Sequence, residues 1–239
     1  MWENWPTEQK ILVVLAHPDD PEFFCGATIA RWTAAGHNVV YWLLTCGDKG
    51  AQDPVTNPDE LCNVRVVEQK AAAAVLGVHE VNFLGYADGY LVPDLELRRD
   101  VTRIIRRERP DILVTCDPRN LFFGDIRINH PDHRAAGQVV LDAAFPAAGN
   151  PLFYPELLSE EGLQPHNVKE VWASLTQEPN IHMDVTELWE TKIRALYEHK
   201  SQIGEPQKLA ERMRARHTPD STPENPRYEE NFKRIVFPV

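Results

Sequence analysis

Short, unbroken runs of aliphatic residues recur along the chain and are separated by segments with a helical spacing of apolar positions. The runs have the length of strands and do not alternate with polar residues, which is typical of strands buried on both faces. We expect strands at residues 10–16, 38–45, 80–84, 111–116, 168–175 and 180–185. We expect helices at residues 22–35, 65–76, 95–108, 133–144 and 187–200.

The alternation of strands and helices predicts the fold class. It indicates an α/β fold of three layers, with a mostly parallel, Rossmann-like sheet covered by helices on both faces. At 239 residues the chain is long for one such domain and short for two, so we interpret residues 1–239 as a single domain.

Three segments are polar or irregular. Residues 48–63 predict a long loop that borders the binding pocket, because they follow a strand end. Residues 146–167 and 205–229 are rich in prolines and too long for ordinary connections. We expect these two segments to be pocket covers, subunit contacts or disordered, and we expect 146–167 in particular to border the pocket.

Composition narrows the functional classes. The net charge of -11 and the pI of about 5.3 argue against a nucleic-acid-binding protein, because phosphates would be repelled. The first residues lack a basic stretch followed by an apolar one, and no run of apolar residues is long enough to span a membrane. We therefore expect a cytoplasmic protein without a membrane span.

The four cysteines are widely spaced and form no C-x-x-C pair. We expect reduced thiols, and neither a zinc ribbon nor a disulfide framework. Cys46 and Cys116 fall at predicted strand ends near the expected site. They could be displaced zinc ligands, but small buried hydrophobic groups are the favoured interpretation.

The first predicted strand runs into the sequence HPDDPE, residues 17–22. Ligands of open α/β sheets bind beyond the carboxyl ends of strands, so this turn is a favoured place for a site. The carboxylates in this turn argue against a nucleotide-binding site, because they would repel a pyrophosphate. A helix cap explains the aspartates and Pro21, but it does not explain His17 at the tip of a buried strand.

A second cluster, NHPDHR at residues 129–134, stands just before a predicted helix. His130 and His133 are three positions apart, which places them on one face of a helical turn. Two imidazoles and one carboxylate make a three-ligand site with an open position for water, as in catalytic zinc enzymes. One carboxylate and one imidazole then remain for acid–base chemistry and for stabilising an oxyanion.

These motifs resemble those of the LmbE-like, or PIG-L, family of zinc-dependent N-acetylglucosaminyl deacetylases. The family hallmark, A/P-H-P-D-D-E followed later by H-P-D-H, corresponds here to Ala16–Asp20 and His130–His133. Pro21 is an insertion that displaces Glu22 by one position, so we assign Glu22 no catalytic role. Further segments resemble the family along most of the chain, among them LLTCGDKG, RVVEQKAAAAVLGV, VNFLGYADGYL and RPDILVTCDP.

The resemblance implies one zinc ion per chain, bound by His17, Asp20 and His133. The residues alone leave open which aspartate of the first cluster binds the metal. The resemblance also implies a small-molecule substrate, an N-acetylated amino sugar or its conjugate, and a homo-oligomer such as a trimer or hexamer.

The remaining roles also come from the resemblance. It implies that Asp19 is the general base and then the acid toward the leaving amine. It implies that His130 stabilises the oxyanion, with Asp132 orienting His130, and that Arg65 and Asp88 hold the sugar. Acetate and a free amine would be the products.

Three alternatives remain beside this hypothesis. The chain could be a zinc amidohydrolase of the same fold that acts on a non-sugar amide. It could be a non-catalytic metal-binding protein, although such a protein would not need Asp19 and His130. A two-metal phosphodiesterase is weaker, because the ligand set suffices for one metal only.

Overall fold

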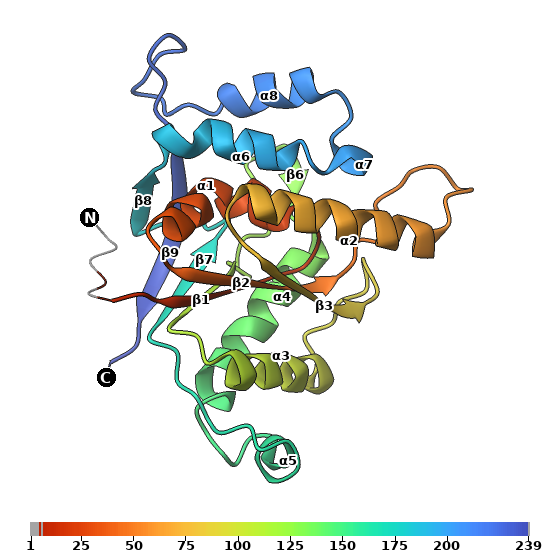
Figure 1. Cartoon of the computed structure of the whole chain (residues 1–239), viewed down its shortest axis with the longest axis vertical. Coiled ribbons are helices and arrows are strands. Elements are labelled where there is room, and N and C mark those ends of the chain that lie inside the picture. The colour runs from red at the N-terminus through yellow and green to blue at the C-terminus, as the bar shows by residue number, and fades with distance from the viewer. Residues whose placement is uncertain (1–4, 6, 239) are drawn as a thin grey trace.

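The computed structural model describes residues 5 and 7–238, which form a sheet between two layers of helices (Figure 1). The seven strands are arranged in the order β3-β2-β1-β4-β7-β9-β8, and the first five of these run parallel. Strand β9 pairs antiparallel with β7 and β8. The strands are β1 (Lys10–Leu15), β2 (Asn38–Thr45), β3 (Glu80–Tyr86), β4 (Ile112–Cys116), β7 (Glu170–Ser174), β8 (Ile181–Asp184) and β9 (Glu229–Val236). The predicted α/β class is therefore confirmed.

Strand β1 shows why the sheet needs two helical layers. Its side chains point alternately to opposite faces of the sheet, so successive residues belong in turn to one or the other of two apolar clusters. Ile11 and Val13 lie in the cluster on one face, whereas Leu12 and Val14 lie in the cluster on the other, and all four are fully buried. An uninterrupted apolar run is thus what this central position requires.

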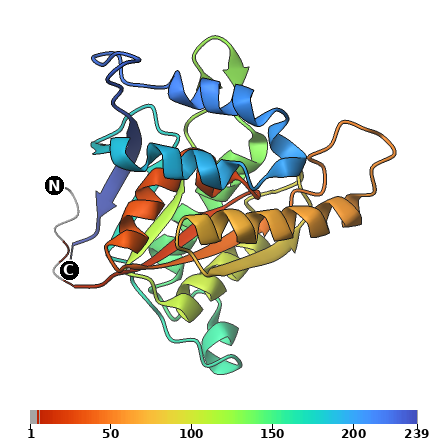
Figure 2. The same ribbon diagram turned by 45° about the horizontal axis from the view of Figure 1, so that its top comes forward.

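The helices divide between the two faces of the sheet. Helices α1, α2 and α6 cover one face, with α7 and α8 above them, and α3 and α4 cover the other (Figures 1 and 2). Their bounds are α1 (Asp20–Ala34), α2 (Pro58–Val75), α3 (Leu95–Glu108), α4 (Pro131–Asp142), α6 (Trp189–Leu196), α7 (Lys200–Ile203) and α8 (Pro206–Arg214). No helix among the described residues is long and apolar enough to cross a membrane.

Several elements differ from expectation. Helix α2 begins at Pro58, seven residues before the predicted start, where Asn57 caps it by accepting a hydrogen bond from the Asp59 amide. The segment 205–229 is not irregular throughout, because it contains α8. Strand β9 was not predicted, nor was the short hairpin of β5 (Phe122–Phe123) and β6 (Arg127–Ile128).

The prediction of four reduced thiols is wrong. Cys46, directly after β2, forms a disulfide with Cys62 in α2, while Cys25 and Cys116 are free and buried. The loop between β2 and α2 folds back, and this brings together two cysteines that are 16 positions apart. Spacing alone did not reveal this return of the chain. The disulfide also removes Cys46 from the potential zinc ligands.

Candidate active site

The site lies where the order of the parallel strands reverses, between the carboxyl ends of β1 and β4. The chain turns from β1 into α1 through the first motif, and it passes from β4 through the β5–β6 hairpin into α4 at the second. Such a reversal point leaves a crevice at the strand ends. Gly137 allows α4 to approach β4 closely, because a Cβ atom there would overlap the Cys116 carbonyl oxygen.

Asp20 joins the two motifs. One of its carboxylate oxygens lies 3.3 Å from His17 Nδ1, and the other lies 3.0 Å from His133 Nε2. The far nitrogen of each imidazole is also held: His17 Nε2 lies 3.3 Å from Asp132 Oδ2, and His133 Nδ1 lies 3.0 Å from Asn129 Oδ1. Each ring therefore presents one nitrogen to Asp20 and is oriented through the other.

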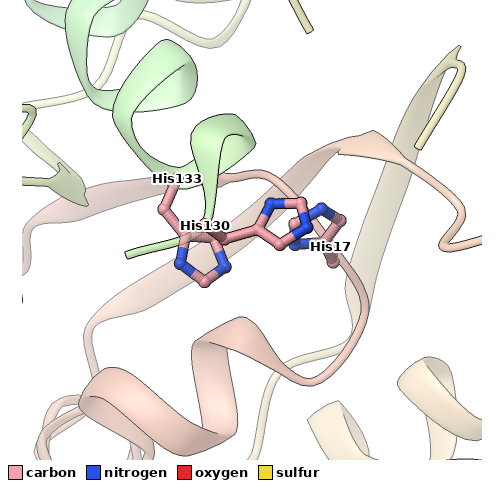
Figure 3. Close-up of side chains that lie close together, drawn as sticks. All are labelled: His17, His130 and His133. Carbon is pink, nitrogen blue, oxygen red and sulfur yellow. The ribbon is translucent and has the colours of Figure 1, made fainter. Parts of the chain in front are cut away.

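His130 has a different arrangement, although its ring also lies beside His17 and His133 (Figure 3). It caps α4, and its Nδ1 accepts a hydrogen bond from the Asp132 amide at 3.2 Å. An acceptor Nδ1 leaves the proton of a neutral imidazole on Nε2. The Asp132 carboxylate does not orient His130; it accepts hydrogen bonds from the Gly89 and Leu91 amides and faces His17.

The carboxylates around His17 stabilise a positive charge at this position. Burial alone would lower the pKa of His17, but Asp20, Asp132 and Asp88 together raise it to about 12. Burial would raise the pKa of Asp20, but His133 and His17 hold it well below its usual range. A group of buried carboxylates that stabilises a positive charge so strongly is suited to a metal ion.

The donor set fits a metal. Two groups of three residues bring ligand atoms within 4.8 Å of one another: the three histidines, and His17 with Asp88 and Asp132. Asp20 belongs to neither group, although it contacts both His17 and His133. Imidazole nitrogen and carboxylate oxygen are the ligands of catalytic zinc sites, and hydrogen bonds to their far atoms commonly orient such ligands.

Asp19 stands beside this cluster in an unusual backbone conformation. Its φ of 83° lies in the left-handed region, which costs a residue with a side chain roughly 1–3 kcal/mol. The side chain of Gln69 stabilises this conformation, because its Oε1 accepts a hydrogen bond from the Asp19 amide at 2.8 Å. Burial and the charge of Asp20 raise the pKa of the Asp19 carboxyl to about 6, even though Arg65 opposes the shift.

Arg65 is the buried partner of Asp19. Its guanidinium lies 3.3 Å from Asp19 Oδ2 and also donates to the carbonyls of Pro18 and Gly47. The loop after β2 surrounds this guanidinium, and a Cβ atom at Gly47 or Gly50 would overlap it. Gly47 also has a φ of +72°, which disfavours a side chain on independent grounds.

Gln69 connects Asp19 to a buried chain of hydrogen bonds. Its Nε2 donates to both oxygens of Glu22 at 3.0 Å and 3.1 Å, and Glu22 lies 3.1 Å from His199 Nε2. Gln69, Glu22 and His199 are all fully buried. The function of Gln69 was missed, because a single glutamine in an alanine-rich helix gives no signal.

One cavity of about 830 Å³, a suitable size for a small sugar conjugate, is lined by His17, Asp19, Asp20, Arg65, His130 and His133. Asp88, whose Oδ2 accepts a hydrogen bond from the Lys49 amide at 3.2 Å, lines it together with Arg65. Lys49 and Gly50 place the loop after β2 at the cavity. The expectation that residues 146–167 border the pocket is wrong, because none of these residues lines the cavity. This segment lies against α3, where Arg106 binds its carbonyls (Figure 1).

The PIG-L family model, described as GlcNAc-PI de-N-acetylase, matches residues 12–144, more than half of the chain. This chain belongs to the PIG-L family. Both histidine motifs, the β2 loop, Arg65 and Asp88 fall within the matched range.

Individual proteins of known name are also similar. The chain is 37% identical to a diacetylchitobiose deacetylase of Thermococcus kodakarensis, over 82% of this chain and 71% of that protein. It is 27% identical to a probable N-acetyl-alpha-D-glucosaminyl L-malate deacetylase 2 of Bacillus anthracis, over 82% of each chain. Its fold matches the N,N'-diacetylchitobiose deacetylase of Pyrococcus horikoshii with a TM-score of 0.86 and 30% identity, over 97% of this chain and 85% of that one.

Proposed function

We propose that this protein is a zinc-dependent deacetylase. It would remove the acetyl group from an N-acetylated amino sugar or its conjugate, of the N-acetylglucosaminyl type, and release acetate and a free amine. The observation that carries the proposal is Asp19, a carboxylate with a raised pKa, held in a strained turn beside the histidine and aspartate cluster. Among the relatives are deacetylases of diacetylchitobiose and of an N-acetylglucosaminyl conjugate.

His17, Asp20 and His133 would hold one zinc ion, because Asp20 already lies against the inward nitrogens of both rings. Bound there, zinc would polarise the acetamide carbonyl and lower the pKa of a water molecule toward about 7. His17 donates a hydrogen bond to Asp132 and His133 donates one to Asn129, and these bonds keep both rings turned toward Asp20.

Asp19 and His130 would supply the acid–base and oxyanion chemistry. The ionised Asp19 carboxylate accepts the proton of the attacking water, and the protonated carboxyl then passes it to the departing amine. His130 holds its proton on Nε2 and donates from there to the oxygen that gains charge as water adds. The Asp132 amide fixes this tautomer, so the backbone of Asp132 and not its carboxylate orients His130.

Asp88 and Arg65 would define the sugar side of the pocket. Asp88 can accept hydrogen bonds from sugar hydroxyls, since it lines the cavity beside the cluster. Arg65 has most of its donors committed to Asp19 and to two carbonyls. We therefore assign Arg65 a second task, which is to keep Asp19 oriented.

Acetate release from a panel of substrates tests the proposal. The zinc-loaded protein should release acetate from N-acetylglucosaminides such as N,N'-diacetylchitobiose, and much more slowly from a simple N-alkyl acetamide. Comparable rates on both would favour the zinc amidohydrolase with a non-sugar substrate. No release from any of them would support the non-catalytic, metal-binding alternative.

We also propose a homo-oligomer, a trimer or hexamer, located in the cytoplasm. The β5–β6 hairpin supports the oligomer, because Phe122, Ile126 and Ile128 expose 53%, 91% and 68% of their surface. Exposed apolar groups gathered on one hairpin are typical of a contact surface. Light scattering on the purified protein would give the molar mass and test the assembly.

A further inference from the structure

Three arginines gather at the rim of the cavity, opposite in sign to the carboxylates on its floor. Arg127 comes from β6, and Arg212 comes from α8, with Arg216 just after that helix. The hairpin and α8 lie side by side above the sheet (Figures 1 and 2). Segments far apart in the sequence thus bring three guanidiniums to one edge of the site.

Within the part of the chain that the structure describes, these arginines have no acidic partners. Within residues 5 and 7–238, no ion pair and no side-chain hydrogen bond involves Arg127, Arg212 or Arg216; Arg127 only stacks on the Phe123 ring at 4.5 Å. This is unexpected in a chain with 36 acidic and 25 basic residues. By contrast, Arg214 on the same helix forms two hydrogen bonds with Glu190.

The three charges are also close enough to repel one another. Desolvation, and then the charges of Arg212 and Arg127, lower the pKa of the Arg216 guanidinium. Repelling cations without a counter-charge are stabilised when an anion binds among them. The other cations of the cavity are already engaged: Lys49 pairs with Asp48, and Arg65 contacts Asp19.

We propose that the substrate carries an anionic group, a carboxylate or a phosphate, on the part of the molecule remote from the acetamide, and that Arg127, Arg212 and Arg216 bind it. This inference rests on the proposed deacetylase function and specifies its substrate class. The acetamide lies at the histidine and aspartate cluster on the floor, and the aglycone extends to the rim. A neutral disaccharide lacks the group that these arginines would bind.

The test compares kcat/KM on three substrates that differ in the aglycone: N,N'-diacetylchitobiose, which is neutral, N-acetylglucosaminyl L-malate, which carries carboxylates, and N-acetylglucosamine 1-phosphate. At least one of the two anionic substrates should be preferred over the neutral one. Whichever is preferred identifies the anion as a carboxylate or a phosphate. The preference should weaken with added salt, since exposed charges are screened.

The double variant Arg212→Gln/Arg216→Gln should lower kcat/KM for the preferred anionic substrate by about 10- to 100-fold, the effect of losing one charge-assisted contact or more. For diacetylchitobiose, kcat/KM should change by less than about threefold. Arg214→Gln is the matched control, with the same chemical change on the same helix, and should leave both rates unchanged.

The outcomes separate the two proposals. A preference for diacetylchitobiose, or equal losses on neutral and anionic substrates in the double variant, overturns the anion site and leaves the deacetylase intact. Acetate release from none of the three substrates refutes the deacetylase and the anion site with it.

Discussion

Replacing Gln69 with leucine removes the side chain that links the Asp19 turn to Glu22. Leucine has a similar volume but no polar atom, so the Asp19 amide loses its acceptor and the buried Glu22 carboxylate loses a donor. The Asp19 amide is left without a partner, which costs about 1–3 kcal/mol, and Glu22, which keeps His199, loses a charge-assisted hydrogen bond worth about 1.5–3 kcal/mol. The free energy of unfolding should therefore fall by about 2–6 kcal/mol, a large share of the roughly 5–15 kcal/mol of an ordinary domain.

Activity should fall as well, because the left-handed conformation of Asp19 loses its support. A displacement of the base by about 1 Å can cost on the order of 10²-fold in rate. Urea unfolding followed by circular dichroism gives the stability, and acetate release from diacetylchitobiose gives kcat/KM.

Gln138→Leu is the matched control, since Gln138 lies on the exposed face of α4 and donates only to Asp142. It should change stability by less than about 0.5 kcal/mol. If Gln69→Leu were as stable and as active as Gln138→Leu, the reasoning that Gln69 holds the Asp19 turn would be refuted.

Three further perturbations test neighbouring parts of the site. Gly47→Ala should lower kcat/KM by about 10- to 100-fold, because its Cβ would displace the Arg65 guanidinium that contacts Asp19; an unchanged rate would show that the loop can adjust. The kcat/KM of the wild type should fall as the pH drops through about 6, because burial and Asp20 raise the pKa of Asp19 and only its ionised form accepts a proton. A profile that stays flat into the ordinary carboxylate range would place the base elsewhere. Reducing the disulfide between Cys46 and Cys62, which are 16 positions apart, should lower the free energy of unfolding by about 3 kcal/mol, measured by urea unfolding with and without dithiothreitol. An unchanged midpoint would contradict this.

Strong local patterns predicted the fold and the two motifs well. The apolar run before His17 can only be a buried strand, and the strand β2, helix α3 and strand β4 follow similarly clear patterns. His17 and His133 lie close together because the turn after β1 and the start of α4, which the chain reaches after β4, lie at the same edge of the sheet.

The remaining parts depend on contacts between distant segments. The Cys46–Cys62 disulfide requires the loop to fold back, and the lining of the cavity by α8 requires the C-terminal segment to return over α6. The backbone role of Asp132 in orienting His130 depends on a helix cap that residue types alone do not distinguish from a side-chain contact.

The central claim is that one zinc ion held by His17, Asp20 and His133 works with Asp19 as base. Titrating the metal-free protein with zinc while measuring acetate release from an N-acetylglucosaminide tests it most directly. Activity should rise from near zero and saturate at about one zinc per chain. Asp19→Asn should bind the same amount of zinc but release acetate about 10²–10⁴-fold more slowly. Full activity of the metal-free protein, or a near-wild-type rate of zinc-loaded Asp19→Asn, would contradict the account.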